Sequence, residues 1–245
     1  MATFDITAII NLHAEGALAH ASLKSHLRAR TFAEASGLRV ESLAVLDKPT
    51  PETLEVLPHF ASMGIRSLTV EHGDAGQARN SGVGAANGAW VAFLDGDDLW
   101  GESWLVAACN AANKDSRSII WHPTANIYFG TQRYLFAHLD MEDEDFDLVN
   151  LSFNNYWTAL SFAKRELFLS LPYQASNLEG QVGYEDWNWN LEAISRGYLH
   201  KCVPGTVHAI RARQHSVSQE TVKHNGLPAP TMLFREMIGR QMPSR

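Results

Sequence analysis

Residues 90–100 read Trp-Val-Ala-Phe-Leu-Asp-Gly-Asp-Asp-Leu-Trp, an apolar run that ends in three carboxylates, Asp95, Asp97 and Asp98. Short apolar strands of α/β proteins are covered on both faces, and charge at their carboxyl ends reaches the crevice where ligands bind. Three neighbouring carboxylates repel one another unless a cation lies among them, and a hard divalent ion suits oxygen ligands. The stretch predicts a buried strand with a metal site at its end, or alternatively a strand followed by an ordinary acidic turn.

The first 104 residues alternate strand signals with helix signals. Apolar runs predict strands over residues 4–10, 38–46, 65–70 and 90–95, and helical spacing predicts helices over residues 18–37, 50–63 and 76–88. Thr50 suits the N-cap of the helix that runs toward Met63. Helix 76–88 is rich in Gly and Ala, which allow close packing on a sheet. The alternation predicts an α/β fold with a parallel or mainly parallel sheet flanked by helices.

After Trp104 the alternation is less regular. The pattern predicts helices over residues 104–113, 154–169 and 186–196, strands over 118–122 and 126–130, and a loop over 171–184. Gly197 suits the C-cap of the helix 186–196. The acidic stretch 140–147 lacks the ligand spacing of a calcium loop, which favours a solvated loop over a metal cage.

Composition narrows the functional class. The chain has 245 residues, of which 45% are hydrophobic and 19% charged, typical values for a globular protein. Its formal net charge of -7 argues against binding to nucleic acid or to anionic lipid, which require clustered Lys and Arg. Cys109 and Cys202 lie far apart and indicate neither a disulfide framework nor a zinc cluster, so we expect a reducing, cytoplasmic location. The apolar stretch 6–10 is too short to span a bilayer, and we expect no transmembrane helix.

Six motifs in a fixed order resemble glycosyltransferase family 2, whose members have the GT-A fold and transfer a sugar from a nucleotide donor with inversion. The motifs span about residues 5–218, and the combination of Ala-Arg-Asn-x-Gly with Phe-Leu-Asp-x-Asp-Asp is the most specific part of the resemblance. In chain order they are Ile9-Ile10-Asn11-Leu12-His13-Ala14-Glu15-Gly16, Val45-Leu46-Asp47, Gly76-Gln77-Ala78-Arg79-Asn80-Ser81-Gly82, Phe93-Leu94-Asp95-Gly96-Asp97-Asp98, Tyr184-Glu185-Asp186-Trp187 and the segment 211–218.

The resemblance implies a nucleotide-sugar site with a Mn²⁺ or Mg²⁺ ion that neutralises the diphosphate leaving group. Asp97 is the expected direct metal ligand, and Asp95 is expected near the donor ribose or a water of the metal shell. The family's metal-binding His falls at Arg213 in this chain, so His215 becomes a further candidate ligand.

The other donor contacts also follow from the resemblance. Those expected around the base, the ribose and the diphosphate are Asn11, Leu12, His13, Glu15, Asp47, Arg79, Arg211 and Arg213. The loop 11–15 departs from the commoner Pro-Thr-Tyr-Asn form, which leaves the base open, with uracil favoured. Arg79 could instead fix a loop beside the diphosphate or be a surface cation, and Arg211 and Arg213 could also be surface cations.

The Glu-Asp pair resembles the family's catalytic-base motif. Asp186 is expected to take the proton of the acceptor hydroxyl, and the start of a helix favours its anionic form. The alternative is that Asp186 only caps that helix. Glu185, Tyr184 and Trp187 are expected on the acceptor side, although large aromatic residues are often core residues.

These expectations combine into one functional hypothesis. It is an inverting, metal-dependent transfer from a UDP-sugar to a saccharide or lipid-linked saccharide acceptor, in glycan or cell-surface polysaccharide assembly. The expected location is the cytoplasm or the inner face of the membrane. Residues 1–104 would bind the nucleotide-sugar, 105–226 would hold the acceptor and the base, and 227–245 would form a tail or helix. Two alternatives remain open: a sugar-nucleotide nucleotidyltransferase, and a non-catalytic binder of nucleotide or carbohydrate.

Overall fold

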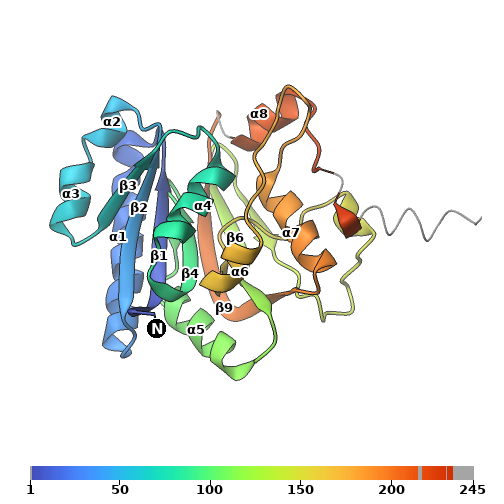
Figure 1. The fold of residues 1–245 in the computed structure, drawn as a ribbon, viewed down its shortest axis with the longest axis horizontal. Coiled ribbons are helices and arrows are strands. Elements are labelled where there is room, and N and C mark those ends of the chain that lie inside the picture. Colours follow the sequence, from blue (N-terminus) through green and yellow to red (C-terminus); the bar gives the residue numbers. More distant parts are fainter. Residues whose placement is uncertain (1, 215–216, 230, 234–245) are drawn as a thin grey trace, which may run out of the picture.

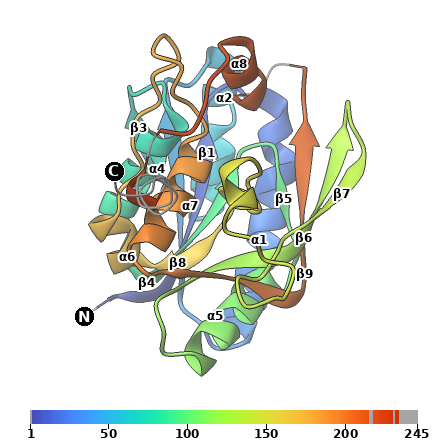
Figure 2. The same ribbon diagram turned by 90° about the vertical axis from the view of Figure 1, so that its right-hand side faces the viewer.

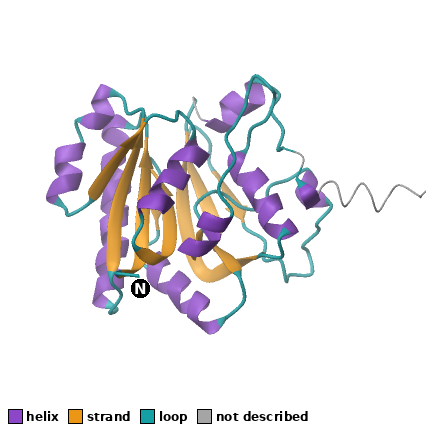
Figure 3. Cartoon of the chain, in the orientation of Figure 1, coloured by secondary structure: helices purple, strands orange, loops and turns teal. Residues whose placement is uncertain are grey.

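The fold is built on one mixed sheet. The computed structural model describes residues 2–214, 217–229 and 231–233. Within them, nine strands form a single sheet in the order β3-β2-β1-β4-β8-β6-β9-β5, and β7 pairs with β6 beside this path. Helices cover both faces of the sheet, as Figures 1 and 3 show. The predicted GT-A-like α/β sheet flanked by helices is therefore confirmed.

The elements have the following bounds. The strands are β1 (Phe4–Leu12), β2 (Val40–Asp47), β3 (Arg66–Val70), β4 (Gly88–Asp95), β5 (Leu99–Trp100), β6 (Ile119–Gly130), β7 (Tyr134–Ala137), β8 (Phe162–Lys164) and β9 (Leu199–Ala212). The helices are α1 (Ala19–Ala35), α2 (Pro51–Leu54), α3 (Leu57–Ser62), α4 (Ala75–Ala85), α5 (Trp104–Lys114), α6 (Arg165–Ser170), α7 (Glu185–Ser195) and α8 (Val217–Lys223), with 3-10 turns η1 (Gly16–Leu18) and η2 (Asn150–Ser152). None of the helices in these described parts is both long and apolar enough to cross a bilayer.

The four strands β3, β2, β1 and β4 are parallel and carry a hydrophobic core on each face. Along β1, Ile6, Ala8 and Ile10 belong to the core that includes buried residues of α1 and α5. Ile9, between them, belongs to the opposite core, with Val83 of α4. Successive side chains of a strand point to opposite faces, which explains why a continuous apolar run is needed here.

This parallel pairing brings polar strand ends to one edge of the sheet. Asn11 of β1 lies beside Asp95 of β4, and Leu12 lies beside Leu46, the residue before Asp47. Three segments that are far apart in the sequence therefore end at the same place. The strand-end crevice expected from the sequence is formed by this edge.

Three expected elements differ in the structure. The helix expected over 50–63 is two short helices, α2 and α3, because Pro58 lacks the N–H that a continuous helix would need. Thr50 does cap α2, accepting a hydrogen bond from the Thr53 N–H. The strands expected over 118–122 and 126–130 are one strand, β6, with an irregularity between Pro123 and Ala125.

The helix expected over residues 154–169 is wrong except for its last turn. Only α6 is helical there, while β8 inserts between β4 and β6 as an antiparallel strand. Phe162 is fully buried in that strand, so tertiary burial overrides the helical spacing of the apolar residues. The long strands β6 and β9 run parallel to each other, with β7 beside β6 (Figure 2).

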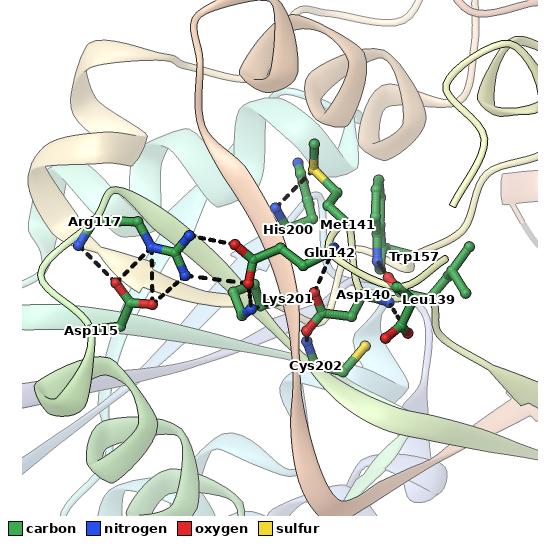
Figure 4. Close-up of polar contacts among 11 residues, drawn as sticks. Asp115, Arg117, Leu139, Asp140, Met141, Glu142, Trp157, His200, Lys201 and Cys202 are labelled. Carbon is green, nitrogen blue, oxygen red and sulfur yellow. Dashed lines mark hydrogen bonds and ion pairs between the residues drawn. The ribbon is translucent and has the colours of Figure 1, made fainter. Parts of the chain in front are cut away.

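The acidic stretch 140–147 is a loop tied to the sheet by ion pairs, as Figure 4 shows. Glu142 pairs with Arg117 and with Lys201 of β9, and Asp140 lies 3.5 Å from the Lys201 Nζ atom. Next to it, the Trp157 indole N–H donates to the Leu139 carbonyl at 2.7 Å. Of the tail or helix expected over residues 227–245, the structure describes only residues 227–229 and 231–233.

Substitutions at two glycines of α4 test how tightly this helix packs on the sheet. A Cβ atom at Gly82 would lie 2.9 Å from Val45 Cγ2 and 3.2 Å from Ile9 Cδ1, whereas at Gly84 it would meet nothing within 4 Å. We expect Gly82→Ala to lower the free energy of unfolding by about 1–3 kcal/mol through overpacking. Gly84→Ala should raise it by about 0.5–1 kcal/mol, since alanine restricts the unfolded chain. Urea denaturation of both variants checks this, and equal shifts would contradict the close packing.

Candidate active site

A cavity of about 510 Å³ opens at the carboxyl edge of the parallel strands. Its walls come from the β1–η1 loop, the end of β2, the start of α4, the acidic end of β4, the β6–β7 hairpin, the first residue of α7 and the end of β9. Of the residues predicted from the sequence, it is lined by Asn11, Leu12, His13, Glu15, Asp47, Arg79, Asp95, Asp97, Glu185, Arg211 and Arg213. The structure thus gathers the predicted donor residues into one concave site of ligand size.

Arg79 is the buried centre of the cavity floor. Its side chain is only 3% exposed, which excludes a surface cation. Nη2 donates to both oxygens of Asp95 at 3.1 and 3.2 Å, and Nη1 donates to Glu185 Oε1 at 2.9 Å. Burial alone would lower the pKa of Arg79 by disfavouring the charged guanidinium. The nearby carboxylates of Asp95 and Glu185 have the larger combined effect and raise this pKa. Arg79 therefore joins the end of β4 to the start of α7 by charge-assisted hydrogen bonds.

The end of β9 supplies two more arginines to the acidic motif. Arg213 Nε lies 2.7 Å from Asp97 Oδ2, and Arg213 Nη2 lies 3.7 Å from Glu15. The Arg211 N–H donates to Asp98 Oδ1 at 2.7 Å, and the Arg211 guanidinium lies over the Phe129 ring.

Burial changes the proton affinity of this motif. Withdrawal from water raises the pKa of Asp97 to about 6, although Arg213 acts in the opposite direction. Burial, reinforced by Asp95 and Asp97, raises the pKa of Asp98 well above its usual value. The arginines thus stabilise the charged carboxylates of this motif, while burial favours the protonated forms of Asp97 and Asp98.

The acidic motif does not form a complete metal cage by itself. Among the residues that the structure describes, no three His, Cys, Asp or Glu side chains are arranged to hold a metal ion. Asp95 is committed to Arg79, and Asp97 is paired with Arg213. His215, the other candidate ligand, lies outside the described residues. The site fits an ion held by Asp97 and completed by substrate phosphates, a common arrangement for Mg²⁺, provided that Arg213 moves aside.

Asp47 is anchored at the opposite wall. Its two carboxylate oxygens accept the N–H groups of Gly73 and Asp74, both at 2.8 Å, and its carbonyl contacts His13 Nδ1 at 2.6 Å. Asp74 in turn caps α4, accepting from the Gln77 N–H. A carboxylate has about four acceptor positions, so Asp47 can still accept a further bond from a ligand.

The start of α7 places Glu185 and Asp186 differently. Glu185 lines the cavity, whereas Asp186 lies beside it and is not part of its lining. Asp186 accepts from the Trp187 N–H at 2.8 Å and from the Asn155 amide at 3.3 Å, and the N-cap residue is Tyr184. Burial, followed by the adjacent charge of Glu185, raises the pKa of Asp186 to about 7.

The two aromatic residues predicted to contact the acceptor do not line the cavity. The Trp187 indole N–H donates to the Leu151 carbonyl at 2.8 Å, and Trp187 packs on a small core around Leu151 and Trp157. Tyr184 lies edge-on to Trp187, with its backbone in the left-handed region at φ +55. These contacts agree with the alternative reading, in which such aromatic residues have a packing role.

Several cavity residues were missed by sequence reasoning. They are Gly73, Asp74, Tyr128, Gln132, Tyr134 and Gln219. A signal did exist for the hairpin: two short runs of aromatic and aliphatic residues, Ile127-Tyr128-Phe129 and Tyr134-Leu135-Phe136, flank the segment 130–133, which begins with Gly130.

Comparisons with known proteins agree with this geometry. The family model described as Glycosyl transferase family 2 matches residues 7–170. The chain is similar to the structure of S. aureus TarS 1-349 in complex with UDP-GlcNAc, at 15% identity and TM-score 0.65, covering 88% of this chain and 60% of that one. No curated protein sequence matches significantly.

Two further solved structures share the fold. GalNAc-T7 with UDP, GalNAc and Mn²⁺ matches at 15% identity and TM-score 0.63, over 96% of this chain and 48% of that one. The mannosyltransferase PcManGT from Pyrobaculum calidifontis, in complex with GDP-Man and Mn²⁺, matches at 16% identity and TM-score 0.62, over 99% and 67%. The family match extends over more than half of the sequence, and the protein belongs to glycosyl transferase family 2.

Proposed function

We propose that this glycosyltransferase uses a UDP-sugar and inverts the anomeric centre while transferring the sugar to a saccharide. The observation that carries the proposal is the single cavity in which the loop after β1, the acidic end of β4 and the start of α7 meet. Similar folds were solved with UDP-GlcNAc, with UDP and Mn²⁺, and with GDP-Man and Mn²⁺. Two of these three contain a uracil nucleotide, which supports UDP over GDP.

The donor would lie along the β1 and β2 strand ends. Asn11, Leu12, His13 and Glu15 would surround the base and ribose, and Asp47 would accept a bond from the base edge. Arg211 and Arg213, which already face the acidic motif, would bind the diphosphate by charge-assisted hydrogen bonds. Arg79, whose two Nη atoms already donate to Asp95 and Glu185, would fix the floor under the donor.

Asp97 would hold the Mn²⁺ or Mg²⁺ ion, with Asp95 toward the ribose or the ion's water shell and His215 as a further candidate ligand. When bound, the ion would supply Lewis-acid stabilisation of the diphosphate leaving group. The arginines of β9 would share that task by neutralising the same developing charge.

Asp186 would remove the proton from the attacking hydroxyl. A general base works best with a pKa near the operating pH, and burial brings the pKa of Asp186 to about 7. The Arg79–Glu185 ion pair would hold the start of α7, and with it Asp186, at a fixed distance from the donor. A base facing the anomeric carbon from the side opposite the leaving group gives inversion.

The acceptor would be a saccharide or lipid-linked saccharide in glycan or cell-surface polysaccharide assembly, with the enzyme working in the cytoplasm or beside the inner membrane face. A nucleotidyltransferase is disfavoured by the family match. A non-catalytic binder predicts that Asp186 is dispensable for ligand binding and that wild type releases no nucleoside diphosphate from any donor.

Removing Arg213 should strengthen Mn²⁺ binding to the nucleotide-free protein. A cation that binds Asp97 must displace the Arg213 guanidinium. The Arg213 side chain is 32% exposed, so we assign its ion pair with Asp97 only about 1 kcal/mol, which corresponds to a roughly fivefold change in Mn²⁺ affinity. We expect this gain in Arg213→Gln when free Mn²⁺ is followed by electron paramagnetic resonance. Arg28→Gln removes the same charge from the exposed face of α1 and serves as the control. Equal Mn²⁺ affinities of the two variants would contradict the competition.

Replacing Asp97 or Asp186 should abolish turnover by different routes. The assay follows the release of nucleoside diphosphate from UDP- and GDP-sugars, with a mixture of saccharides as acceptors. We expect Asp186→Asn to lose at least about 100-fold in rate with nucleotide binding intact, and Asp97→Asn to lose nucleotide binding as well.

The same assay has a defined pH dependence. The base must be deprotonated, so the wild-type rate should fall about tenfold for each pH unit below 7 and level off above 8. Glu179→Gln, on the exposed loop before α7, is the matched control and should behave as wild type. Full turnover by Asp186→Asn would refute the assigned base, whereas nucleotide binding by wild type without any turnover would leave a binding protein as the better reading.

A further inference from the structure

The β6–β7 hairpin brings a stacked pair of tyrosines into the cavity wall. Tyr128 of β6 and Tyr134 of β7 are direct partners in the antiparallel ladder. Their ring centroids are 4.3 Å apart and their planes differ by 9°. Both residues line the cavity, and Tyr134 remains 46% exposed while Tyr128 is partly buried behind it. The pair therefore presents an aromatic surface to water inside an otherwise polar site.

The hairpin shares the cavity wall with the acidic motif. Tyr128 pairs with Ile210 of β9, one residue before Arg211. Burial is the largest cause that raises the pKa of Tyr128, and the neighbouring Tyr134, Asp98 and Asp186 act in the same direction. The Tyr128 hydroxyl is thus within electrostatic reach of both Asp98 and Asp186. A molecule resting on this pair would lie in the same cavity as Glu185, the residue before the candidate base.

The chemistry of such a surface selects a particular ligand. A pyranose ring has an apolar C–H face and a polar rim of hydroxyls, and it matches a flat ring surrounded by carboxylates and amides. Aromatic contacts of this kind contribute about 0.5–1.5 kcal/mol beyond the area that they bury. The cavity offers polar rim partners in Gln132, on the turn of the same hairpin, and Glu185. The nucleotide wall formed by residues 11–15 and Asp47 belongs to other elements of the fold.

We infer that Tyr134, supported from behind by Tyr128, is the binding platform for a pyranose ring of the acceptor. The inference rests on the proposed function and moves the acceptor contact from Tyr184 and Trp187, which do not line the cavity, to the β6–β7 hairpin. Stacking fixes the plane of the sugar ring and leaves its hydroxyls free to face Asp186. Tyr134 is then a specificity-determining residue for the acceptor and makes no contact with the nucleotide.

Saturation-transfer NMR on the full chain tests whether Tyr134 binds a pyranose ring. The probes are the methyl pyranosides of glucose, galactose, mannose and N-acetylglucosamine, and UDP, GDP and Mn²⁺ are present. We expect at least one probe to receive saturation from aromatic protons of the wild type. Tyr134→Ala should weaken its binding about fivefold, a shift within the range of one stacking contact. Tyr134→Phe and Tyr134→Trp keep a ring and should retain binding. Phe153→Ala, which removes an aromatic residue that is 76% exposed away from the cavity, should have no effect.

Nucleotide affinity, measured by calorimetry in the same variants, separates the possible outcomes. Unchanged nucleotide affinity with lost pyranoside binding in Tyr134→Ala supports the platform. Lost nucleotide affinity in that variant means that the ring stacks on the base, which overturns the inference. Absence of pyranoside binding to wild type overturns it too. If no nucleotide binds to wild type, the proposed function fails; Tyr134-dependent pyranoside binding would then still support the subsite. Thermal melting confirms that each variant is folded.

Discussion

The site depends on one electrostatic constraint: parallel strands deliver several carboxylates to the same edge of the sheet, and arginines must neutralise them. Without compensation, like charges at this spacing and burial would repel one another and lose hydration. The structure meets the constraint with two guanidinium groups, that of Arg79 in α4 beside Asp95 and that of Arg213 just after β9 beside Asp97, while the backbone N–H of Arg211 donates to Asp98. These arginines come from segments that are far apart in the sequence, so their ion pairs also fix how the two halves of the sheet fit together.

The same constraint connects folding with the proposed chemistry. Arg79 is buried and paired with both Asp95 and Glu185, as a structural cation would be, whereas Arg213 is partly exposed and paired with Asp97 alone at short distance. A diphosphate with its metal ion would offer Arg213 a new anionic partner and Asp97 a new cation. Under the proposed function, ligand binding exchanges one neutral pairing for another, so the carboxylates are never left without compensation.

The sequence predicted the parallel half of the fold because its strands are buried on both faces and read as continuous apolar runs. It also predicted most of the residues that line the cavity at the strand ends, since polar residues follow β1, β2 and β4 directly. It failed at residues 154–169, where the burial of Phe162 in β8 decides the structure. The Arg79–Glu185 pair joins residues 106 positions apart, and the Tyr128–Tyr134 stack depends on a hairpin register. Local periodicity carries no information about such tertiary pairings.

Calorimetric titration of the intact chain with UDP, GDP and dTDP, each with and without Mn²⁺, tests the central claim most directly. If the edge of the sheet is a nucleotide-sugar site balanced by cations, one nucleotide will bind clearly more tightly than the others, and its affinity will rise when Mn²⁺ is added. That dependence on Mn²⁺ will disappear in Asp97→Ala. Binding of all three nucleotides with equal affinity regardless of Mn²⁺, or binding of none, would contradict the account.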